Sequence, residues 1–256
     1  MATAFNTKTR RARSQMSYRA VIFDLFGTLL SVEYTGTRET AVQTLVAAGV
    51  PEADWLRGWR ATFEPGARGE LRTLRQRVVA ALGTAGIAQP DDALVDQVCG
   101  LLIGRWYPQL YRDVRPTLAA LRSRGFQTGL ISNMRADERP AFAVFDLDPL
   151  FDVITLSCEV GLAKPDPAIY RLTAERLSLN PEECVFVDDV GTYLAGARAV
   201  GMATVFIDRA ENEFGDKAAG SYHPAAGTYD LRVEALGDLF SWLPASAVPY
   251  TLDPKP

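Results

Sequence analysis

An apolar run that ends in an aspartate, Val21–Asp24, constrains the fold more than any other stretch of this chain. A short, fully apolar run is typical of a strand buried on both faces, as in a parallel sheet. The pair Gly27-Thr28 follows and can turn the chain sharply. Because reactive groups in open α/β sheets lie beyond the carboxyl ends of the strands, Asp24 stands where a nucleophile or metal ligand would be expected. An aspartate that only caps a turn is the alternative.

The composition indicates which kinds of partner and which cellular compartment to expect. The 256 residues are 48% hydrophobic with a formal net charge of −4, so we expect neither nucleic acid nor a membrane as partner. No apolar run is long enough to span a bilayer. The three cysteines stand far apart in apolar segments, which predicts free thiols and a cytoplasmic protein. A single histidine, His223, and the lack of a Gly-x-Ser-x-Gly motif argue against a serine hydrolase.

The pattern divides the chain into an arm, an insert and a core. Residues 1–18 are basic and lack the apolar segment of a signal peptide, so we expect a disordered arm. Residues 34–112 place apolar side chains at helical spacing, and nothing in them indicates a strand. We therefore predict an all-helical domain at 34–112 and a core domain formed by residues 19–33 and 113–256.

After residue 113 the pattern alternates between helix and strand. Besides the strand that precedes Asp24, we predict apolar strands at 128–131, 151–156, 184–187 and 203–207. Repeated strand–helix units form right-handed crossovers on both faces of a sheet. The predicted fold class is therefore α/β, a doubly wound, Rossmann-like parallel sheet, with the helical insert between its first and second strands.

Four polar signals fall at corresponding places, each at or just past the end of a strand. They are Asp24, Ser132-Asn133, Lys164 and Asp188-Asp189. A parallel sheet brings such positions to one edge, so three carboxylates, a hydroxyl and one ammonium should converge. Three carboxylates raise one another's pKa values and one lysine offsets this only in part, so Mg²⁺ would complete the cluster. A surface role for Lys164 and a helix N-cap for Asp188-Asp189 are the alternatives.

Four motifs in this order resemble the haloacid dehalogenase (HAD) superfamily of aspartate-nucleophile hydrolases that carry a helical C1-type cap. The motifs are Phe23–Leu29 (FDLFGTL), Ile131–Asn133 (ISN), Val160–Pro167 (VGLAKPDP) and Val187–Met202 (VDDVGTYLAGARAVGM). The resemblance covers nearly the whole chain after the arm. It implies that residues 34–112 form a mobile cap over a small-molecule substrate.

The resemblance also implies roles for single residues. The implied catalytic residues are Asp24 as nucleophile, Ser132 as hydrogen-bond donor to the transferring group and Lys164 as neutralising charge. The implied substrate contacts are Leu25, Phe26 and Asn133. The implied cofactor is Mg²⁺, held by Asp24, Asp188, Asp189 and the backbone carbonyl of Phe26.

Phe26 departs from the phosphatases of this family, which carry an aspartate there as general acid and base. General acid–base catalysis is worth about 10²–10⁴-fold, so simple alkyl phosphates should be poor substrates. The leading hypothesis is a Mg²⁺-dependent phosphatase-like enzyme for a small activated phosphate. The first alternative is an L-2-haloacid dehalogenase, since halide leaves without a proton and that subfamily also carries an aromatic residue there.

Two observations weigh against the dehalogenase alternative. Dehalogenases work without metal and do not keep the acidic pair 188–189, and they need a carboxylate-binding arginine from the cap. The cap offers Arg38, Arg57, Arg60 and Arg105, none of which matches by motif. A further alternative is a catalytically impaired protein with a binding role, which Tyr193 favours because many relatives have Asn or Asp there. The apolar face of the predicted cap helices could also pack against a second copy of the chain, so a homodimer is possible.

Overall fold

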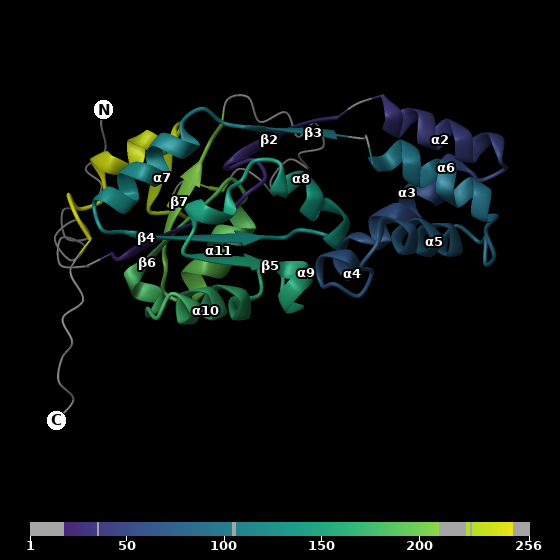
Figure 1. Ribbon diagram of the computed structural model, residues 1–256. Coiled ribbons are helices and arrows are strands. Elements are labelled where there is room, and N and C mark those ends of the chain that lie inside the picture. Colours follow the sequence, from purple (N-terminus) through teal and green to yellow (C-terminus); the bar gives the residue numbers. More distant parts are fainter. Residues whose placement is uncertain (1–17, 35, 104–105, 210–223, 226, 248–256) are drawn as a thin grey trace.

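Six parallel strands form the central sheet, in the order β5-β4-β1-β6-β7-β8 (Figure 1). The computed structural model describes residues 18–34, 36–103, 106–209, 224–225 and 227–247. The strands are β1 (Ala20–Phe23), β4 (Gln127–Ser132), β5 (Val153–Leu156), β6 (Cys184–Asp188), β7 (Ala203–Ile207) and β8 (Leu231–Val233). The doubly wound α/β fold predicted from the sequence is confirmed. All five predicted strands are present, and β8 is an additional edge strand.

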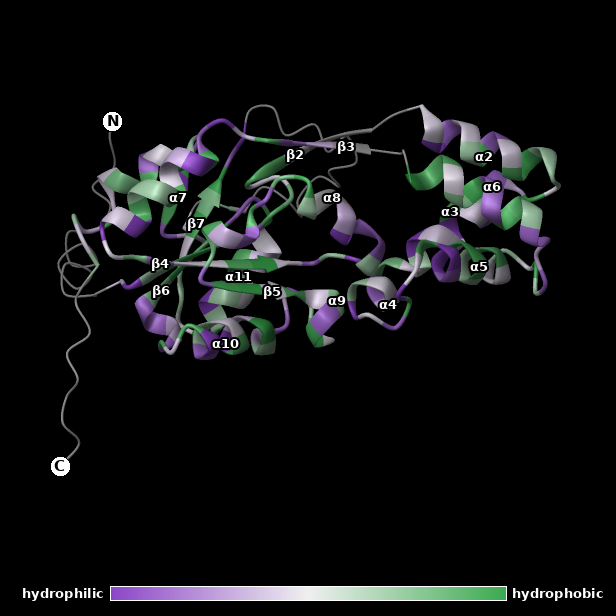
Figure 2. Ribbon diagram, viewed as in Figure 1, coloured by the Kyte–Doolittle hydropathy of each residue, from purple (hydrophilic) through white to green (hydrophobic). Residues whose placement is uncertain are grey.

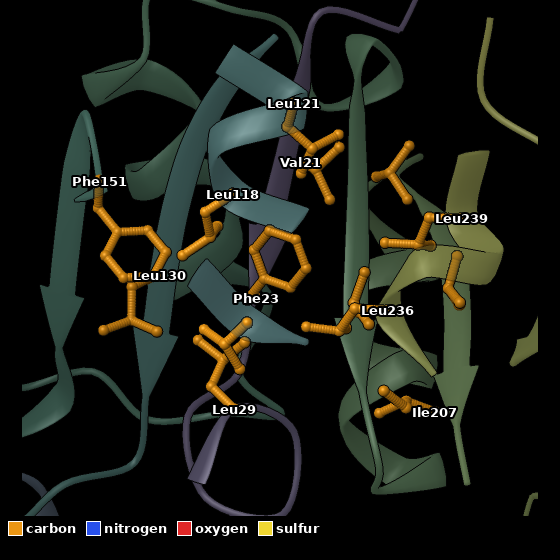
Figure 3. Packing of buried hydrophobic residues seen from close by; sticks show 14 of the residues in the cluster. Val21, Phe23, Leu29, Leu118, Leu121, Leu130, Phe151, Ile207, Leu236 and Leu239 are labelled. Atoms are coloured by element: carbon orange, nitrogen blue, oxygen red, sulfur yellow. The ribbon is translucent and has the colours of Figure 1, made fainter. Parts of the chain in front are cut away.

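Helices cover both faces of the sheet because the apolar strands have no polar face. On one side Val21 and Phe23 of β1 pack against α7 (Val114–Ser123) and the 3₁₀-helix η4 (Leu236–Ser241), as Figure 3 shows. On the other side Ile22 packs with residues of α10 (Pro167–Arg176) and α11 (Gly191–Ala199). Successive residues of a strand point to opposite faces, so the uninterrupted apolar run of β1 is what fixes it at the centre. β1 lies between β4 and β6.

Shorter elements connect the strands and helices of the core. They are η1 (Ala136–Glu138), α8 (Arg139–Ala143), η2 (Asp148–Leu150), α9 (Ser157–Val160) and η3 (Pro181–Glu183). Of these, η1 follows the carboxyl end of β4, and α9 follows that of β5. Both therefore lie at the edge of the sheet where the predicted site residues meet.

The helical insert comprises the five helices that occupy residues 37–103. They are α2 (Thr37–Ala47), α3 (Glu52–Ala61), α4 (Phe63–Ala67), α5 (Leu74–Thr84) and α6 (Asp92–Ile103). They enclose an apolar cluster of their own, separate from the two that flank the sheet, with Trp55, Val78 and Val98 among its members. Figure 2 shows hydrophilic and hydrophobic residues mixed along these helices, as expected of helices that bury one apolar stripe.

A two-stranded antiparallel ribbon joins the insert to the core. It is formed by β2 (Leu30–Tyr34) and β3 (Trp106–Leu110). The prediction that residues 34–112 contain no strand is therefore wrong at both ends, at Tyr34 and at Trp106–Leu110. The two connections run side by side and can pair with each other, and a ribbon outside the main sheet tolerates Pro108 because no third strand needs its missing N–H.

The amino-terminal boundary also differs slightly from the prediction. Tyr18 was assigned to the basic arm but is buried, and its ring stacks on Trp242 at 5.3 Å between centroids. Residues 1–17 of the predicted arm, and His223, lie outside the described residues. No helix in the described part of the chain has the length and apolar character that a membrane span requires.

Candidate active site

Asp24 lies directly after β1, at the carboxyl edge of the sheet. Its backbone N–H donates a hydrogen bond of 2.9 Å to the carbonyl of Val187 on β6, and only 5% of the residue is exposed. The chain then turns through Gly27, whose φ is +86°. A Cβ at Gly27 would lie 2.3 Å from a carboxylate oxygen of Asp189, so this close approach requires glycine. The turn thus brings the loop after Asp24 against the end of β6.

Lys164 joins two of the carboxylates. Its Nζ donates to Oδ1 of Asp24 at 2.5 Å and to Oδ2 of Asp188 at 2.6 Å, and its side chain is fully buried. Burial alone would lower the pKa of Lys164, but the carboxylates of Asp188 and Asp24 outweigh it and raise that pKa. The interpretation of Lys164 as a surface residue is wrong, because its side chain is buried and paired with two carboxylates.

Asp188 and Asp189 end β6 and complete an acidic cluster with Asp24. One carboxylate oxygen of each residue lies within 4.8 Å of the other two. Burial raises the pKa of Asp188 well above its usual value, Lys164 opposes this shift, and the nearby Asp24 and Asp189 reinforce it. Three carboxylates against one lysine leave an excess of buried negative charge, and oxygen donors of this kind suit Mg²⁺.

Ser132 and Asn133 lie at the carboxyl end of β4. Ser132 is fully buried, and its hydroxyl has no hydrogen-bond partner among the described residues. The side-chain amide of Asn133 donates to the Lys164 carbonyl and accepts from the Lys164 N–H, both at 2.8 Å. Asn133 therefore fixes the backbone that carries the lysine, and Ser132 holds an unused donor.

Leu25 and Phe26 occupy different environments. Leu25 is fully buried in the apolar cluster on one face of the sheet, so a substrate could reach only its backbone. Phe26 is partly buried and packs against the same cluster. Its side chain supplies no acid or base to the carboxylate cluster.

Tyr193 contacts the site in a way that its sequence position did not indicate. The Nζ of Lys164 lies 4.6 Å from the centroid of its ring, and the hydroxyl of Tyr170 donates to its backbone carbonyl at 2.7 Å. Burial raises the pKa of the Tyr193 phenol. Tyr193 therefore covers the lysine with an aromatic face and excludes water from it.

The buried arginine of the insert is Arg77, which was not among the four candidates. Arg57 of that set pairs with Asp54 on the surface, and Arg105 lies outside the described residues. Arg77 on α5 is fully buried and pairs with Asp137 of η1 through Nη1, at 3.0 and 2.9 Å. The spacing of apolar residues along the helix could not identify Arg77 as buried, because the carboxylate that pairs with it belongs to the core.

The chain matches a family model over most of its length. A model described as haloacid dehalogenase-like hydrolase matches residues 18–201. Mouse acyl-CoA dehydrogenase family member 10 is 31% identical over 203 residues, which are 76% of this chain and 18% of the mouse protein. The chain thus corresponds to a small part of that relative.

Two further relatives are matched over most of their own length. Phosphatase MT3486 of Mycobacterium tuberculosis is 28% identical over 201 residues, 76% of this chain and 89% of the phosphatase. (S)-2-haloacid dehalogenase 4A of Burkholderia cepacia is 28% identical over 204 residues, 77% of this chain and 85% of the dehalogenase. The crystal structure of a 2-haloacid dehalogenase from Pseudomonas syringae shares the fold, with a TM-score of 0.62, 24% identity, and coverage of 88% of this chain and 97% of that one.

Proposed function

The chain belongs to the haloacid dehalogenase-like hydrolases, and we propose that it is a Mg²⁺-dependent, phosphatase-like enzyme that acts on small phosphates with activated leaving groups. The observation that carries the proposal is the buried cluster of three carboxylates with a single lysine. An excess of buried negative charge is costly unless a cation offsets it. The phosphatase relative supports the same choice.

The donor set fits Mg²⁺. Oxygen atoms of Asp24, Asp188 and Asp189, together with the backbone carbonyl of Phe26, would hold the ion. When bound, Mg²⁺ would offset the charge of the carboxylates and of the substrate phosphate, so that an anionic nucleophile and an anionic substrate can approach each other.

The chain's own residues supply the remaining chemistry. A carboxylate oxygen of Asp24 attacks phosphorus, the bond from phosphorus to the leaving-group oxygen breaks, and an aspartyl phosphate results. The unused hydroxyl of Ser132 would donate to a phosphoryl oxygen, and Lys164 would hold the Asp24 carboxylate in position through its hydrogen bond to Oδ1. Water then cleaves the aspartyl phosphate. Because Phe26 cannot protonate the leaving group, we propose aryl, acyl or enol phosphates as the substrate class.

Phe26 also favours a second candidate, an L-2-haloacid dehalogenase. Asp24 would then displace halide from carbon, and water would cleave the resulting ester. Halide leaves without a proton, and the dehalogenase relative supports this chemistry. The pair Asp188-Asp189 weighs against it, since metal-free catalysis gives no reason to bury two further carboxylates beside the nucleophile.

The test compares two substrates in one buffer. Hydrolysis of 4-nitrophenyl phosphate should require Mg²⁺, should stop in excess EDTA and should be absent from Asp24→Asn. The second assay measures chloride released from L-2-chloropropionate in excess EDTA. Chloride release that depends on Asp24, without phosphate release, would overturn the phosphatase proposal in favour of the dehalogenase.

A further inference from the structure

Arg209, which follows β7, lies beside the loop that carries Asp24. Its guanidinium donates to the backbone carbonyl of Thr28 through Nε at 3.3 Å and Nη2 at 2.9 Å. It also pairs with both carboxylate oxygens of Asp113, through Nη1 at 2.8 Å and Nη2 at 3.0 Å. Arg209 is only 8% exposed, and its guanidinium lies 4.1 Å from the centroid of the Tyr111 ring. Four hydrogen bonds and a stacked ring hold this side chain in one position.

The partners of Arg209 belong to both connections between the core and the helical insert. Thr28 lies in the turn after Asp24 and two residues before β2 begins. Asp113 and Tyr111 lie in the segment between β3 and α7, and the N–H of Tyr111 donates to the carbonyl of Leu29 at 3.1 Å. Asp113 also accepts from the N–H of Leu236 at 2.8 Å. Arg209 thus joins the outgoing and the returning connection at the base of the β2–β3 ribbon.

We infer that Arg209 is a positioning residue that locks the turn after Asp24 to the segment by which the chain returns from the helical insert. For catalysis, this role rests on the proposed function. Within the turn, the N–H groups of Leu29 and Leu30 donate to the carbonyl of Leu25, and the N–H of Gly27 donates to the carbonyl of Leu30. Arg209 adds side-chain hydrogen bonds that link this turn to the returning segment. A lysine could reach either the Thr28 carbonyl or the Asp113 carboxylate as a point charge, but it could not form the planar fork that holds both.

The experiment measures hydrogen exchange of the backbone amides in residues 25–30 together with turnover of 4-nitrophenyl phosphate. The variants are Arg209→Gln and Arg209→Lys. Arg209→Lys retains the positive charge, and it replaces Arg209→Gln in the experiment if that variant does not fold. Arg232→Gln is the matched control, because Arg232 forms its ion pairs with Asp208 and Glu234 on the surface. Hydrogen exchange requires no activity, so it tests the positioning role even if the wild-type protein hydrolyses no phosphate.

We expect exchange in residues 25–30 to be about tenfold faster in both Arg209 variants and unchanged in Arg232→Gln. We expect kcat to fall by about tenfold to 100-fold while KM stays within roughly threefold, because the nucleophile is displaced without loss of a substrate contact. Unchanged exchange in a folded Arg209 variant would overturn the positioning role. Normal kcat despite faster exchange would overturn its contribution to catalysis. A wild-type protein without phosphatase activity would instead refute the proposed function.

Discussion

Phe26 lies two residues after Asp24, and its side chain can neither donate nor accept a proton. If the Asp24 chemistry is phosphoryl transfer, Phe26→Asp should restore a proton donor for the leaving group. We expect turnover of an alkyl phosphate such as glycerol phosphate to rise by at least about tenfold, which is a part of the 10²–10⁴-fold that general acid catalysis typically contributes. Turnover of 4-nitrophenyl phosphate should change far less, because that leaving group departs unprotonated.

Phe26→Asn is the matched control for this prediction. It has the size and polarity of aspartate but no acidic proton, so it should leave alkyl phosphate turnover unchanged. An equal gain in both variants would show that a smaller side chain, and not a proton donor, is responsible.

If the proposed Mg²⁺ site forms, Asp188 should make its affinity for the metal depend on pH. Its burial, reinforced by the neighbouring Asp24 and Asp189, raises its pKa despite Lys164. Because Mg²⁺ binds the ionised carboxylate, lowering the pH through this raised pKa adds a proton that competes with the metal. Titration calorimetry should show Mg²⁺ affinity falling by up to about tenfold per pH unit below the pKa. Mg²⁺ affinity that does not fall as the pH is lowered would contradict this prediction.

The raised pKa of Asp188 also predicts how the stability of the metal-free protein depends on pH. An aspartate whose pKa is raised on folding binds its proton more tightly in the folded state than in the unfolded state. Its contribution therefore destabilises the fold above the raised pKa, and stability increases as the pH falls toward the usual range of aspartate. Asp188→Asn should remove this contribution and stabilise the metal-free protein at neutral pH, as urea denaturation can measure.

At the scale of elements, one buried ion pair joins the helical insert to the core. Arg77 of α5 pairs with Asp137 of η1, and its guanidinium lies 4.3 Å from the centroid of the Trp59 ring. Nε and Nη2 of Arg77 have no hydrogen-bond partner within the described ranges. Burial, followed by the charge of Arg135, lowers the pKa of Arg77 to about 10. Among the described residues, the hydrogen bonds of the Arg77 guanidinium are thus those that Nη1 donates to the Asp137 carboxylate.

Arg77→Met should therefore destabilise the protein by about 3–5 kcal/mol, because it leaves Asp137 as a buried charge without its main partner. The double variant Arg77→Met with Asp137→Asn should recover part of this loss, and urea denaturation of the cycle measures the coupling. Arg75→Met on the same helix is the control. Arg75 pairs with Asp92 and Asp96 on the surface, so its loss should cost less than about 1 kcal/mol.

The sequence predicted those elements whose hydrophobic pattern can be recognised within a few consecutive residues. Val21–Phe23 and Cys184–Val187 are apolar runs that only a buried strand explains, and the polar residues after them had to meet at one edge. In contrast, β8 has three residues with exposed Arg232 at the centre, so its pattern is too short and too polar to predict. β3 contains Pro108 and exists because β2 lies beside it. The contacts of Tyr193, Arg77 and Arg209 depend likewise on partners far away in the sequence.

At the scale of the whole molecule, the separate apolar clusters of the insert and of the sheet divide the chain into two packing units. Leu82 is fully buried in the insert, and Leu118 is fully buried between α7 and the sheet. Leu82→Ala and Leu118→Ala should each lower the free energy of unfolding by about 2–5 kcal/mol, because each removes buried apolar atoms and leaves a cavity. The two losses should act on different parts of the molecule, since Leu82 and Leu118 belong to apolar clusters that share no residue.

Hydrogen exchange followed by mass spectrometry can separate the two units. Leu82→Ala should speed exchange in α5 and α6 and leave β1, β4 and β6 protected, because local opening of the insert does not require the sheet to unfold. Leu118→Ala should speed exchange in the sheet. If Leu82→Ala instead accelerated all of these segments equally, the insert and the core would unfold as one cooperative unit. Opening of the insert would then require the carboxylate cluster to unfold with it, which is incompatible with an insert that moves as a cap during turnover.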